Sequence, residues 1–496
     1  MDIRICKKDD FHEVCDTLVL AFKEGLEVGG KLNYLSDDIE ATISYLVREE
    51  IFTGKSDQIE SFRTGNDDFP KNVILVGMGA EDKIDSFAIK KAVSKAIKEA
   101  KKMKAKAIEM FPIGKCIGMT LEDVARVISE TVILADYEFD KYKSDKKEST
   151  LREVNIIHKR SDDLGDLEKG ILEGKLLGEA TAFARDLVNE PSNVMTPEAL
   201  AEKAIHASKC HGFETQVLNL KEITDLKMES FISVAKGSVL EPKLIVMRHI
   251  GNPNSNEKYA LVGKGLTYDS GGYAIKPAES MASMKSDMGG AAAVIGAMAA
   301  ISSMKLPINV VGVIAACENM ISGNAYRNGD IIGSMSGKFI EVVNTDAEGR
   351  LTLADALTYA IEKENATKVL DIATLTGAAL VALGTSITPV VASNDEFFSI
   401  LQKASIDSGE KIWRLPADDE LKELLKSDVA DLKNSAGRYG GTITAGLFLK
   451  EFTKDLPWLH LDIAGSSWAE SSSSICPKGG TGAGVRILYH LIKNLV

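Results

Sequence analysis

Two regions of the chain differ in how apolar and polar positions alternate. In the first region, the apolar run at 71–79 predicts a buried strand, and the periodic segment 88–104 predicts a helix. From about residue 142 to 166 the sequence turns polar, which is typical of a domain boundary, and a helical segment follows. The pattern predicts a smaller N-terminal α/β domain over 1–160 and a linker helix over 161–190.

The second region, residues 191–496, alternates short apolar runs with helical segments. Strands are predicted at 243–248, 259–262, 308–315, 339–343, 368–373 and 458–463, and helices at 289–304 and 353–363. Several runs are continuously apolar, as in strands covered on both faces. A further helix is predicted to begin at Thr196-Pro197, a cap residue followed by a helix-starting proline. We expect a larger α/β domain with a mixed, mostly parallel central sheet, whose functional site lies beyond the carboxyl ends of strands.

The composition is that of an ordinary globular protein. The chain has 496 residues, of which 45% are apolar and 26% charged. Its 72 acidic and 59 basic side chains give a net charge of −13, which opposes nucleic acid and anionic membranes as partners. Six cysteines without a C-x-x-C pair indicate reduced thiols, and neither a signal peptide nor a membrane-length apolar run is recognisable. We expect a cytoplasmic enzyme.

Two glycine-rich segments that follow predicted strands carry both carboxylates and cations. Their charged residues are Lys264, Asp269 and Lys276 after the strand 259–262, and Asp346, Glu348 and Arg350 after the strand 339–343. If the chain stays extended beyond 339–343, alternate residues such as Asp346, Glu348 and Arg350 project to one side. Both segments would then contribute to one site at the same end of the sheet.

The acidic side chains of these segments call for a counter-charge. Asp287, just before the glycines of the predicted helix 289–304, brings the number of carboxylates to four. Carboxylates aimed into one site repel each other unless they are protonated or bridged by a cation. Two divalent ions would balance four carboxylates. Such a site suits Mg²⁺ or Mn²⁺, and Zn²⁺ or Co²⁺ if a neutral amine joins it.

Each of these residues also has an ordinary structural interpretation. Asp287 can cap the helix that follows it, Lys264 and Lys276 can be solvated, and Arg350 can pair with Glu348. The glycines of the first segment can form a simple turn. Seven polar groups gathered on a few segments favour a common site over seven separate explanations.

Other catalytic signatures are missing from the sequence. None of the seven histidines lies in these segments, and the chain has no H-E-x-x-H, G-x-S-x-G or Walker A motif. Gly77-x-Gly79 lacks the third glycine of a dinucleotide site, so we interpret it as a tight turn. A carboxylate-rich metal site remains the leading hypothesis.

Several blocks closely resemble the leucyl aminopeptidase (cytosol aminopeptidase) family. They are Val-Gly-Lys-Gly-Leu-Thr-Tyr-Asp-Ser-Gly-Gly at 262–272, Met-Lys-Ser-Asp-Met-Gly-Gly-Ala-Ala-Ala-Val at 284–294 and Asn-Thr-Asp-Ala-Glu-Gly-Arg-Leu at 344–351. Further matches are His-Leu-Asp-Ile-Ala-Gly at 460–465 and Gly-Thr-Gly-Ala-Gly-Val-Arg at 480–486. The resemblance runs from about residue 187 to the C-terminus. The N-terminal region matches the family's smaller α/β domain only in position and length.

The resemblance implies a metal-dependent aminopeptidase that removes N-terminal residues, often leucine, from peptides with a free N-terminus. It assigns Asp269 and Glu348 to bridging two metal ions, which would be Zn²⁺, Mn²⁺ or Co²⁺, with Mg²⁺ a further option. Lys264 and Asp287 would complete one metal site and Asp346 the other. The family is typically hexameric, so a homohexamer is expected.

The resemblance also implies catalytic and pocket residues. Lys276 and Arg350 match the family's catalytic pair, in which the arginine holds a bicarbonate ion thought to act as a general base. Met284, Thr374 and Gly377 match positions that line the pocket for the first side chain, although core or turn roles would explain them equally well. Two other functions remain open: a non-peptidase two-metal hydrolase, such as a phosphatase, and a catalytically silent metal-binding scaffold.

Overall fold

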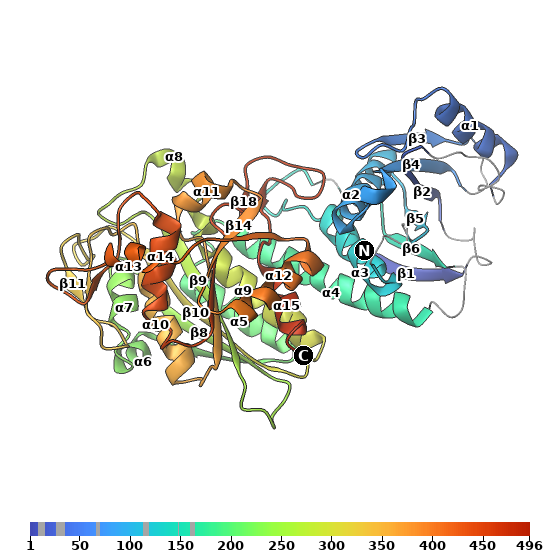
Figure 1. Cartoon of the computed structure of the whole chain (residues 1–496). Coiled ribbons are helices and arrows are strands. Elements are labelled where there is room, and N and C mark those ends of the chain that lie inside the picture. Colours follow the sequence, from blue (N-terminus) through green and yellow to red (C-terminus); the bar gives the residue numbers. More distant parts are fainter. Residues whose placement is uncertain (8–14, 26–34, 66–69, 113–118, 147, 159–163) are drawn as a thin grey trace. The chain divides into compact units, whose positions relative to one another are not determined.

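The computed structural model divides into two compact units. It describes residues 1–7, 15–25, 35–65, 70–112, 119–146, 148–158 and 164–496 (Figure 1). One unit comprises Met1–Ala182 with Ser472–Pro477, and the other comprises Phe183–Ser471 with Lys478–Val496. Cys116 and the predicted domain boundary at 160/161 lie outside the described residues. Within the described ranges, no helix is long and apolar enough to cross a membrane.

The N-terminal unit is an α/β layer. Its sheet runs in the order β1-β6-β5-β2-β4-β3, in which β3 pairs antiparallel with β4 and the other pairs are parallel. The strands are β1 (Asp2–Lys7), β2 (Thr17–Lys23), β3 (Ile59–Arg63), β4 (Asn72–Gly79), β5 (Ala107–Met110) and β6 (Glu153–His158). The helices are α1 (Asp37–Arg48), α2 (Ser86–Met103), α3 (Leu121–Asp136) and the start of α4 (Leu164–Asn189). Every residue of β4 is buried, as its continuous apolar run predicts.

The larger unit is built on a mixed, mostly parallel sheet, which confirms the predicted fold class. Its order is β15-β14-β17-β13-β9-β10-β8-β7, and antiparallel pairing occurs only at β14–β17, β10–β8 and β8–β7 within the described residues. The strands are β7 (Glu214–Leu218), β8 (Lys243–Ile250), β9 (Tyr259–Asp269), β10 (Asn309–Asn319), β13 (Lys368–Ala373), β14 (Ile387–Ala392), β15 (Lys411–Arg414) and β17 (Trp458–Asp462).

Helices cover both faces of this sheet (Figure 1). Those nearest the site are α9 (Gly289–Ser303), α10 (Gly349–Glu362), α11 (Gly377–Leu383) and α14 (Gly441–Lys450). The others are α5 (Pro197–His211), α6 (Leu220–Asp225), α7 (Glu229–Ala235), α8 (Ala278–Met281), α12 (Asp395–Ser408), α13 (Asp419–Glu423) and α15 (Val485–Lys493). The predicted start of α5 is confirmed, because the Thr196 hydroxyl accepts the Ala199 N–H and Pro197 is the first helical residue.

The central strand β9 separates two packing environments. Val262 belongs to the core that contains Leu351 of α10, whereas a side chain at Gly263 would meet the backbone of Gly290 and Ala291 in α9. Because side chains alternate along a strand, Lys264 points to the same face as Val262. The strand therefore aims Lys264 at the start of α10.

Two expectations about the strands are wrong. The segment 339–343 is not part of the central sheet. Only β12 (Ile340–Glu341) forms there, in a small sheet with β11 (Ile331–Ile332) and β16 (Leu432–Lys433), and Phe339 is 55% exposed. The strand predicted at 259–262 extends to Asp269, so Lys264 lies inside β9 rather than in a loop. Glycines at 263 and 265 masked this continuation in the sequence, since glycine is depleted in strands.

Candidate active site

Lys264 is a buried lysine held among oxygen atoms. Its Nζ lies 2.8 Å from a carboxylate oxygen of Asp287 and 2.9 Å from Oε1 of Glu348. It also donates to the Thr374 carbonyl at 2.8 Å. A fully solvated role for Lys264 is therefore wrong, because its side chain is only 3% exposed.

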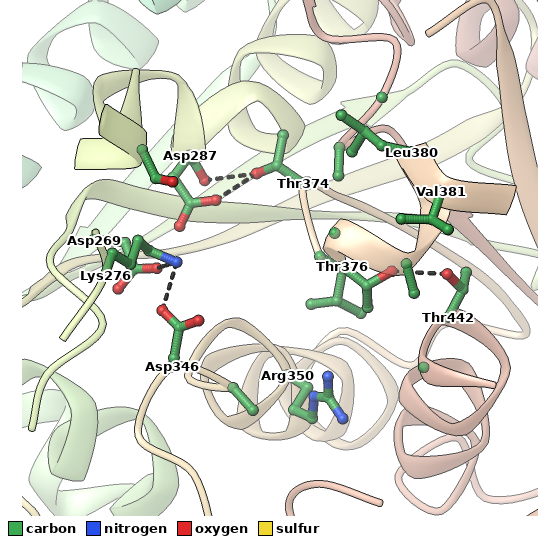
Figure 2. Close-up of a pocket in the computed structure, with 18 of the residues that line it drawn as sticks. Asp269, Lys276, Asp287, Asp346, Arg350, Thr374, Thr376, Leu380, Val381 and Thr442 are labelled. Atoms are coloured by element: carbon green, nitrogen blue, oxygen red, sulfur yellow. Dashed lines mark hydrogen bonds and ion pairs between the residues drawn. The ribbon is translucent and has the colours of Figure 1, made fainter. Parts of the chain in front are cut away.

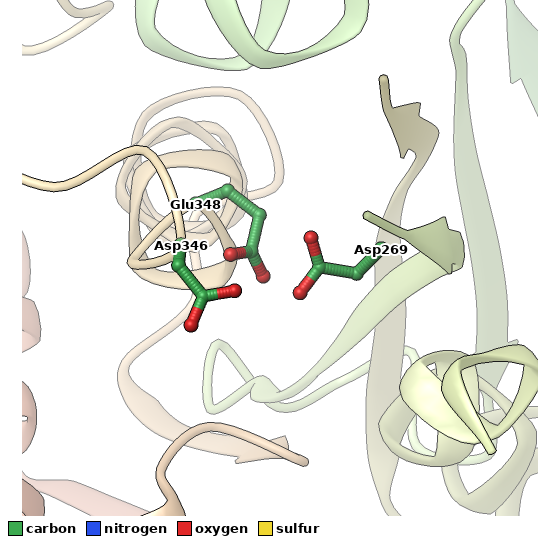
Figure 3. A group of neighbouring side chains, drawn as sticks. All are labelled: Asp269, Asp346 and Glu348. Carbon is green, nitrogen blue, oxygen red and sulfur yellow. The ribbon is translucent and has the colours of Figure 1, made fainter. Parts of the chain in front are cut away.

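Three carboxylates converge at the end of β9 and the start of α10. Asp269, Asp346 and Glu348 each place a carboxylate oxygen within 4.8 Å of the others, as Figure 3 shows. Asp269 is the last residue of β9, and Glu348 immediately precedes α10. Three negative groups this close repel one another strongly unless cations lie between them.

Asp287 joins this group from a separate segment. It lies in the short 3-10 helix η4 (Met284–Met288), and its Oδ1 accepts a hydrogen bond from Lys264 Nζ at 2.8 Å. The same oxygen accepts the Thr374 hydroxyl at 2.8 Å (Figure 2). The alternative that Asp287 merely caps α9 is wrong. The cap position of that helix is Met288, and it has no side-chain cap hydrogen bond.

Lys276 closes the carboxylate group from the other side. Its Nζ lies 2.8 Å from Asp269 Oδ2 and 2.5 Å from Asp346 Oδ1 (Figure 2). Its side chain is 15% exposed, so the ammonium group is shielded from bulk water. The alternative of a solvated Lys276 is therefore wrong, and both lysines act as counter-ions to the acidic cluster.

Burial and mutual charge shift the proton affinities of these groups. Burial, reinforced by the charge of Glu348, raises the pKa of Asp269 to about 8. Burial also raises the pKa of Asp287 to about 6, against the opposing charge of Lys264. Burial disfavours the charged form of Lys264, but Asp287 and Glu348 overcome it and raise its pKa. The pKa of Lys276 is raised in the same way, mainly by Asp269.

The carboxylate group fits a divalent metal centre. Oxygen donors from several carboxylates are what divalent cations select, and a neutral amine adds a ligand suited to Zn²⁺ or Co²⁺. Glu348 Oε2 is buried and has no hydrogen-bond partner among the described residues. An orphaned, buried carboxylate oxygen that faces two other carboxylates is an atom that a cation would satisfy. The residues that could hold metal are Lys264, Asp269, Asp287, Asp346 and Glu348.

Arg350 lies in the first turn of α10, and its guanidinium is buried. Nη1 donates to the Asn434 carbonyl at 2.8 Å, while Nε has no hydrogen-bond partner among the described residues. Burial lowers the pKa of Arg350 to about 10, although Glu348 favours the charged form. The alternative of an ion pair between Arg350 and Glu348 is not what the structure contains. Its one polar contact in the described part of the chain is the Asn434 carbonyl.

The expectation of an extended chain through Asp346, Glu348 and Arg350 is also wrong. A turn at 345–346 leads directly into α10, which begins at Gly349. Asp346 and Glu348 still converge because the turn and the helix start both face β9. Arg350, by contrast, follows the helical path and reaches Asn434.

Gly349 leaves room for the close approach of Lys264. A side-chain carbon at 349 would lie 2.4 Å from Cε and 2.8 Å from Nζ of Lys264. Contacts this short do not occur between real side chains, so even alanine would push the amine away from Glu348. Gly271 has a related role, because it has φ +85° and a side chain there would lie 2.9 Å from Asp346 Oδ1.

The charged cluster opens into a cavity of about 1200 Å³. Met284, Thr374 and Gly377, the residues predicted for the first side chain, all line it. So do Leu380 and Val381 of α11, which are 41% and 90% exposed and lie across the cavity from Asp269 and Lys276 (Figure 2). The cavity therefore has a charged wall and an apolar wall.

Three polar residues that sequence reasoning missed support the site. Asn319 donates to Asp269 Oδ1 at 2.8 Å, and the Asn434 side chain binds the backbone of the segment that carries Asp346. Asp462 binds the turn after β13. Asp462 lies inside a block that matches the family, so that block was the available signal. Asn319 and Asn434 lie outside the matching blocks.

Comparison with known proteins identifies the family. Residues 182–489 match the catalytic domain and residues 18–146 the N-terminal domain of the cytosol aminopeptidase family. The chain is 49% identical to a probable cytosol aminopeptidase of Clostridium perfringens, in an alignment that covers 98% of each chain. It is 48% identical to a probable cytosol aminopeptidase of Treponema denticola, covering 95% of this chain and 96% of that one.

Solved structures agree with this. A tomato leucine aminopeptidase mutant aligns with a TM-score of 0.87 at 34% identity, covering 99% of this chain and 96% of that one. The bottromycin maturation enzyme BotP in complex with Mn aligns with a TM-score of 0.86 at 31% identity, covering 97% and 99%. The chain belongs to the cytosol aminopeptidase family and is a metallo-exopeptidase.

Proposed function

We propose that this aminopeptidase releases N-terminal residues, preferably leucine-type ones, from peptides with a free N-terminus, with two divalent ions at its centre. The observation that carries the proposal is the packing of Asp269, Asp346 and Glu348 within 4.8 Å at the base of the cavity. Two such ions, when bound, polarise the scissile carbonyl and supply a hydroxide nucleophile near neutral pH, as in other two-metal enzymes, aminopeptidases among them. We expect Zn²⁺, Mn²⁺ or Co²⁺, with Mg²⁺ a further option.

The proposal assigns each charged residue one role. Asp269 and Glu348 would bridge the two ions, with Asp346 serving one ion. Lys264 and Asp287 would serve the other. Lys264 can bind metal only as a neutral amine, so loading the site releases its proton. The raised pKa of Lys264 without metal reflects the same carboxylates, because its ammonium compensates their charge.

Lys276 and Arg350 would act on the substrate rather than hold metal. The Lys276 ammonium, fixed by Asp269 and Asp346, supplies positive charge where the carbonyl oxygen becomes negative. Arg350 would hold a bicarbonate ion, which would supply a proton acceptor when bound. Its guanidinium is buried, and its Nε has no hydrogen-bond partner in the part of the chain that the structure describes, so it is suited to hold an anion.

The cavity walls would hold the peptide. Met284, Thr374 and Gly377 would surround the first side chain, since a flexible methionine adapts to a branched apolar group. The apolar Leu380 and Val381 would contact the peptide across the cavity. We further propose a homohexamer in the cytoplasm, without nucleic-acid or membrane partners. Free cysteines, such as Cys210 and Cys317, are typical of a reducing compartment.

Metal removal and restoration test the proposal. After dialysis against a chelator, hydrolysis of Leu-, Ala- and Met-anilides should fall roughly a hundredfold or more, and Mn²⁺, Zn²⁺ or Co²⁺ should restore it. Metal analysis of the restored protein should find two ions per chain. A phosphate ester serves as the parallel substrate. Cleavage of the ester alone would identify a different two-metal hydrolase, and bound metal with no turnover would identify a silent scaffold.

Replacement of Arg350 tests the bicarbonate role. Arg350→Ala should lower kcat about a hundredfold, the usual contribution of a positioned proton acceptor, while both metals stay bound. The wild-type rate should rise when bicarbonate is added to depleted buffer, and the rate of the variant should not. A variant that keeps the wild-type rate and the same bicarbonate response would contradict the role.

A further inference from the structure

Asp462 is a buried carboxylate that the proposed mechanism does not use. It ends β17, beside β13, and it is fully buried. Its Oδ1 accepts backbone N–H groups of Leu375 at 3.0 Å, Thr376 at 3.4 Å and Ala464 at 3.1 Å. Its Oδ2 accepts the Thr376 hydroxyl at 2.6 Å. These four hydrogen bonds fix the turn that follows β13.

The Thr376 hydroxyl connects Asp462 to helix α11. It donates to Asp462 and lies 2.8 Å from the Thr442 hydroxyl, and it accepts the Ala379 N–H as the cap of α11 (Figure 2). Helix α11 carries Leu380 on the apolar wall of the cavity. The position of that wall therefore depends on the same carboxylate.

At the other end of this turn, Thr374 contacts two residues of the charged wall of the cavity. The Thr374 carbonyl accepts the Lys264 ammonium, and the Thr374 hydroxyl donates to Asp287 Oδ1, both at 2.8 Å. A shift of this turn would move the groups that orient Lys264 and Asp287. Groups that orient metal ligands typically change metal affinity or activity 10- to 100-fold when they are removed.

We propose that Asp462 is a positioning residue. It sets both the geometry of the Lys264–Asp287 metal site and the position of α11, which carries Leu380 on the apolar wall of the cavity. The inference rests on the proposed metal centre, and it adds a residue that touches neither metal nor substrate. Through one turn of the chain, Asp462 couples the reacting groups to the wall that contacts the peptide.

Asp462→Asn and Thr376→Val test this inference separately and together. Asp462→Asn keeps the shape of the side chain, but it places an NH₂ group where one carboxylate oxygen accepted hydrogen bonds. Thr376→Val removes the hydroxyl relay and leaves the backbone hydrogen bonds to Asp462 in place, so it remains informative if Asp462→Asn does not fold. The matched control is Thr388→Val, which removes a buried hydroxyl of β14 that bonds to Ser466 in the segment after β17, outside the turn at 374–376.

Isothermal titration with CoCl₂ and steady-state hydrolysis of Leu-anilide provide the readouts. Each test variant should raise the Co²⁺ Kd about tenfold and should also raise KM, with thermal melting confirming that it is folded. The double variant should be no worse than the worse single one, because both act through one turn. Thr388→Val should change neither Kd nor KM.

The outcomes separate this inference from the proposed function. An unchanged Co²⁺ Kd in a folded Asp462→Asn variant would refute it, and so would additive losses or an equal loss in Thr388→Val. If the wild-type protein binds Co²⁺ but does not hydrolyse the anilide, the proposed function fails. The Kd values then still decide whether Asp462 positions the metal site.

Discussion

Glu348→Gln should abolish aminopeptidase activity, with kcat/KM falling by at least about a thousandfold, because the change removes a proposed bridge between two ions. Glu348 is buried, one of its oxygens contacts Lys264 and the other has no partner among the described residues. The amide would aim N–H donors at the cations and would leave Asp287 as the remaining ion-pair partner of Lys264 among the described residues. Metal analysis after gel filtration should find fewer than two ions per chain.

The matched control for Glu348→Gln is Glu364→Gln. Glu364 is another buried glutamate of the same unit; it follows the end of α10 opposite to Glu348 and is paired with Arg248. This control should cost stability and leave metal content and turnover per folded molecule unchanged. Full activity in Glu348→Gln, or equal inactivation by both changes, would contradict the bridging role.

Lys276→Met should give the second-largest effect, and it should separate catalysis from metal binding. Without metal, the Lys276 ammonium neutralises Asp269 and Asp346. Methionine keeps the length but leaves these carboxylates more negative, so metal binding should not weaken. The charge that stabilises the developing oxyanion is lost, and kcat should fall about a thousandfold. Steady-state kinetics with metal analysis of the same sample measures both quantities.

Lys243→Met provides the comparison for Lys276→Met. Lys243 is also a buried lysine. It forms an ion pair with Glu198 and a hydrogen bond to Asn219, and none of these three residues lines the cavity. Lys243→Met should show any loss of folding stability that comes from removing a buried ammonium group, but it should not lower kcat. Loss of metal from Lys276→Met, with kcat per bound metal retained, would instead make Lys276 a structural counter-ion.

Much of the architecture could be predicted because periodic apolar runs report burial directly. The runs at 71–79 and 368–373 correspond closely to β4 and β13, and Thr196-Pro197 marks the start of α5. The run at 339–343 is misleading, because its buried residues Ile340 and Val342 pack into the core from a small separate sheet, while Phe339 is exposed. Alternation alone does not say which sheet a strand joins, since that depends on partners distant in sequence.

The charged residues of the site could be selected from the sequence, but the way they meet could not. Grouping Asp346, Glu348 and Arg350 on an extended chain assumed a strand geometry that the helix start at Gly349 excludes. Taken alone in the sequence, Asp287 fits a helix cap better than a site residue, and only its bonds to Lys264 and Thr374 place it in the site. Asp462 lies in a block that matches the family, but its role could not be predicted, because its partners Leu375 and Thr376 lie on another strand connection.

Gly349 has a consequence for how members of this family diverge. Because residue 349 has no side chain, the end of Lys264 can pass close to the backbone there and reach Glu348. The geometry of the site therefore depends on the absence of a Cβ atom. One extra methyl group would displace the end of the Lys264 side chain while every charged residue stayed in place. Loss of this glycine in a related sequence would therefore alter the site in a way that its charged residues do not reveal.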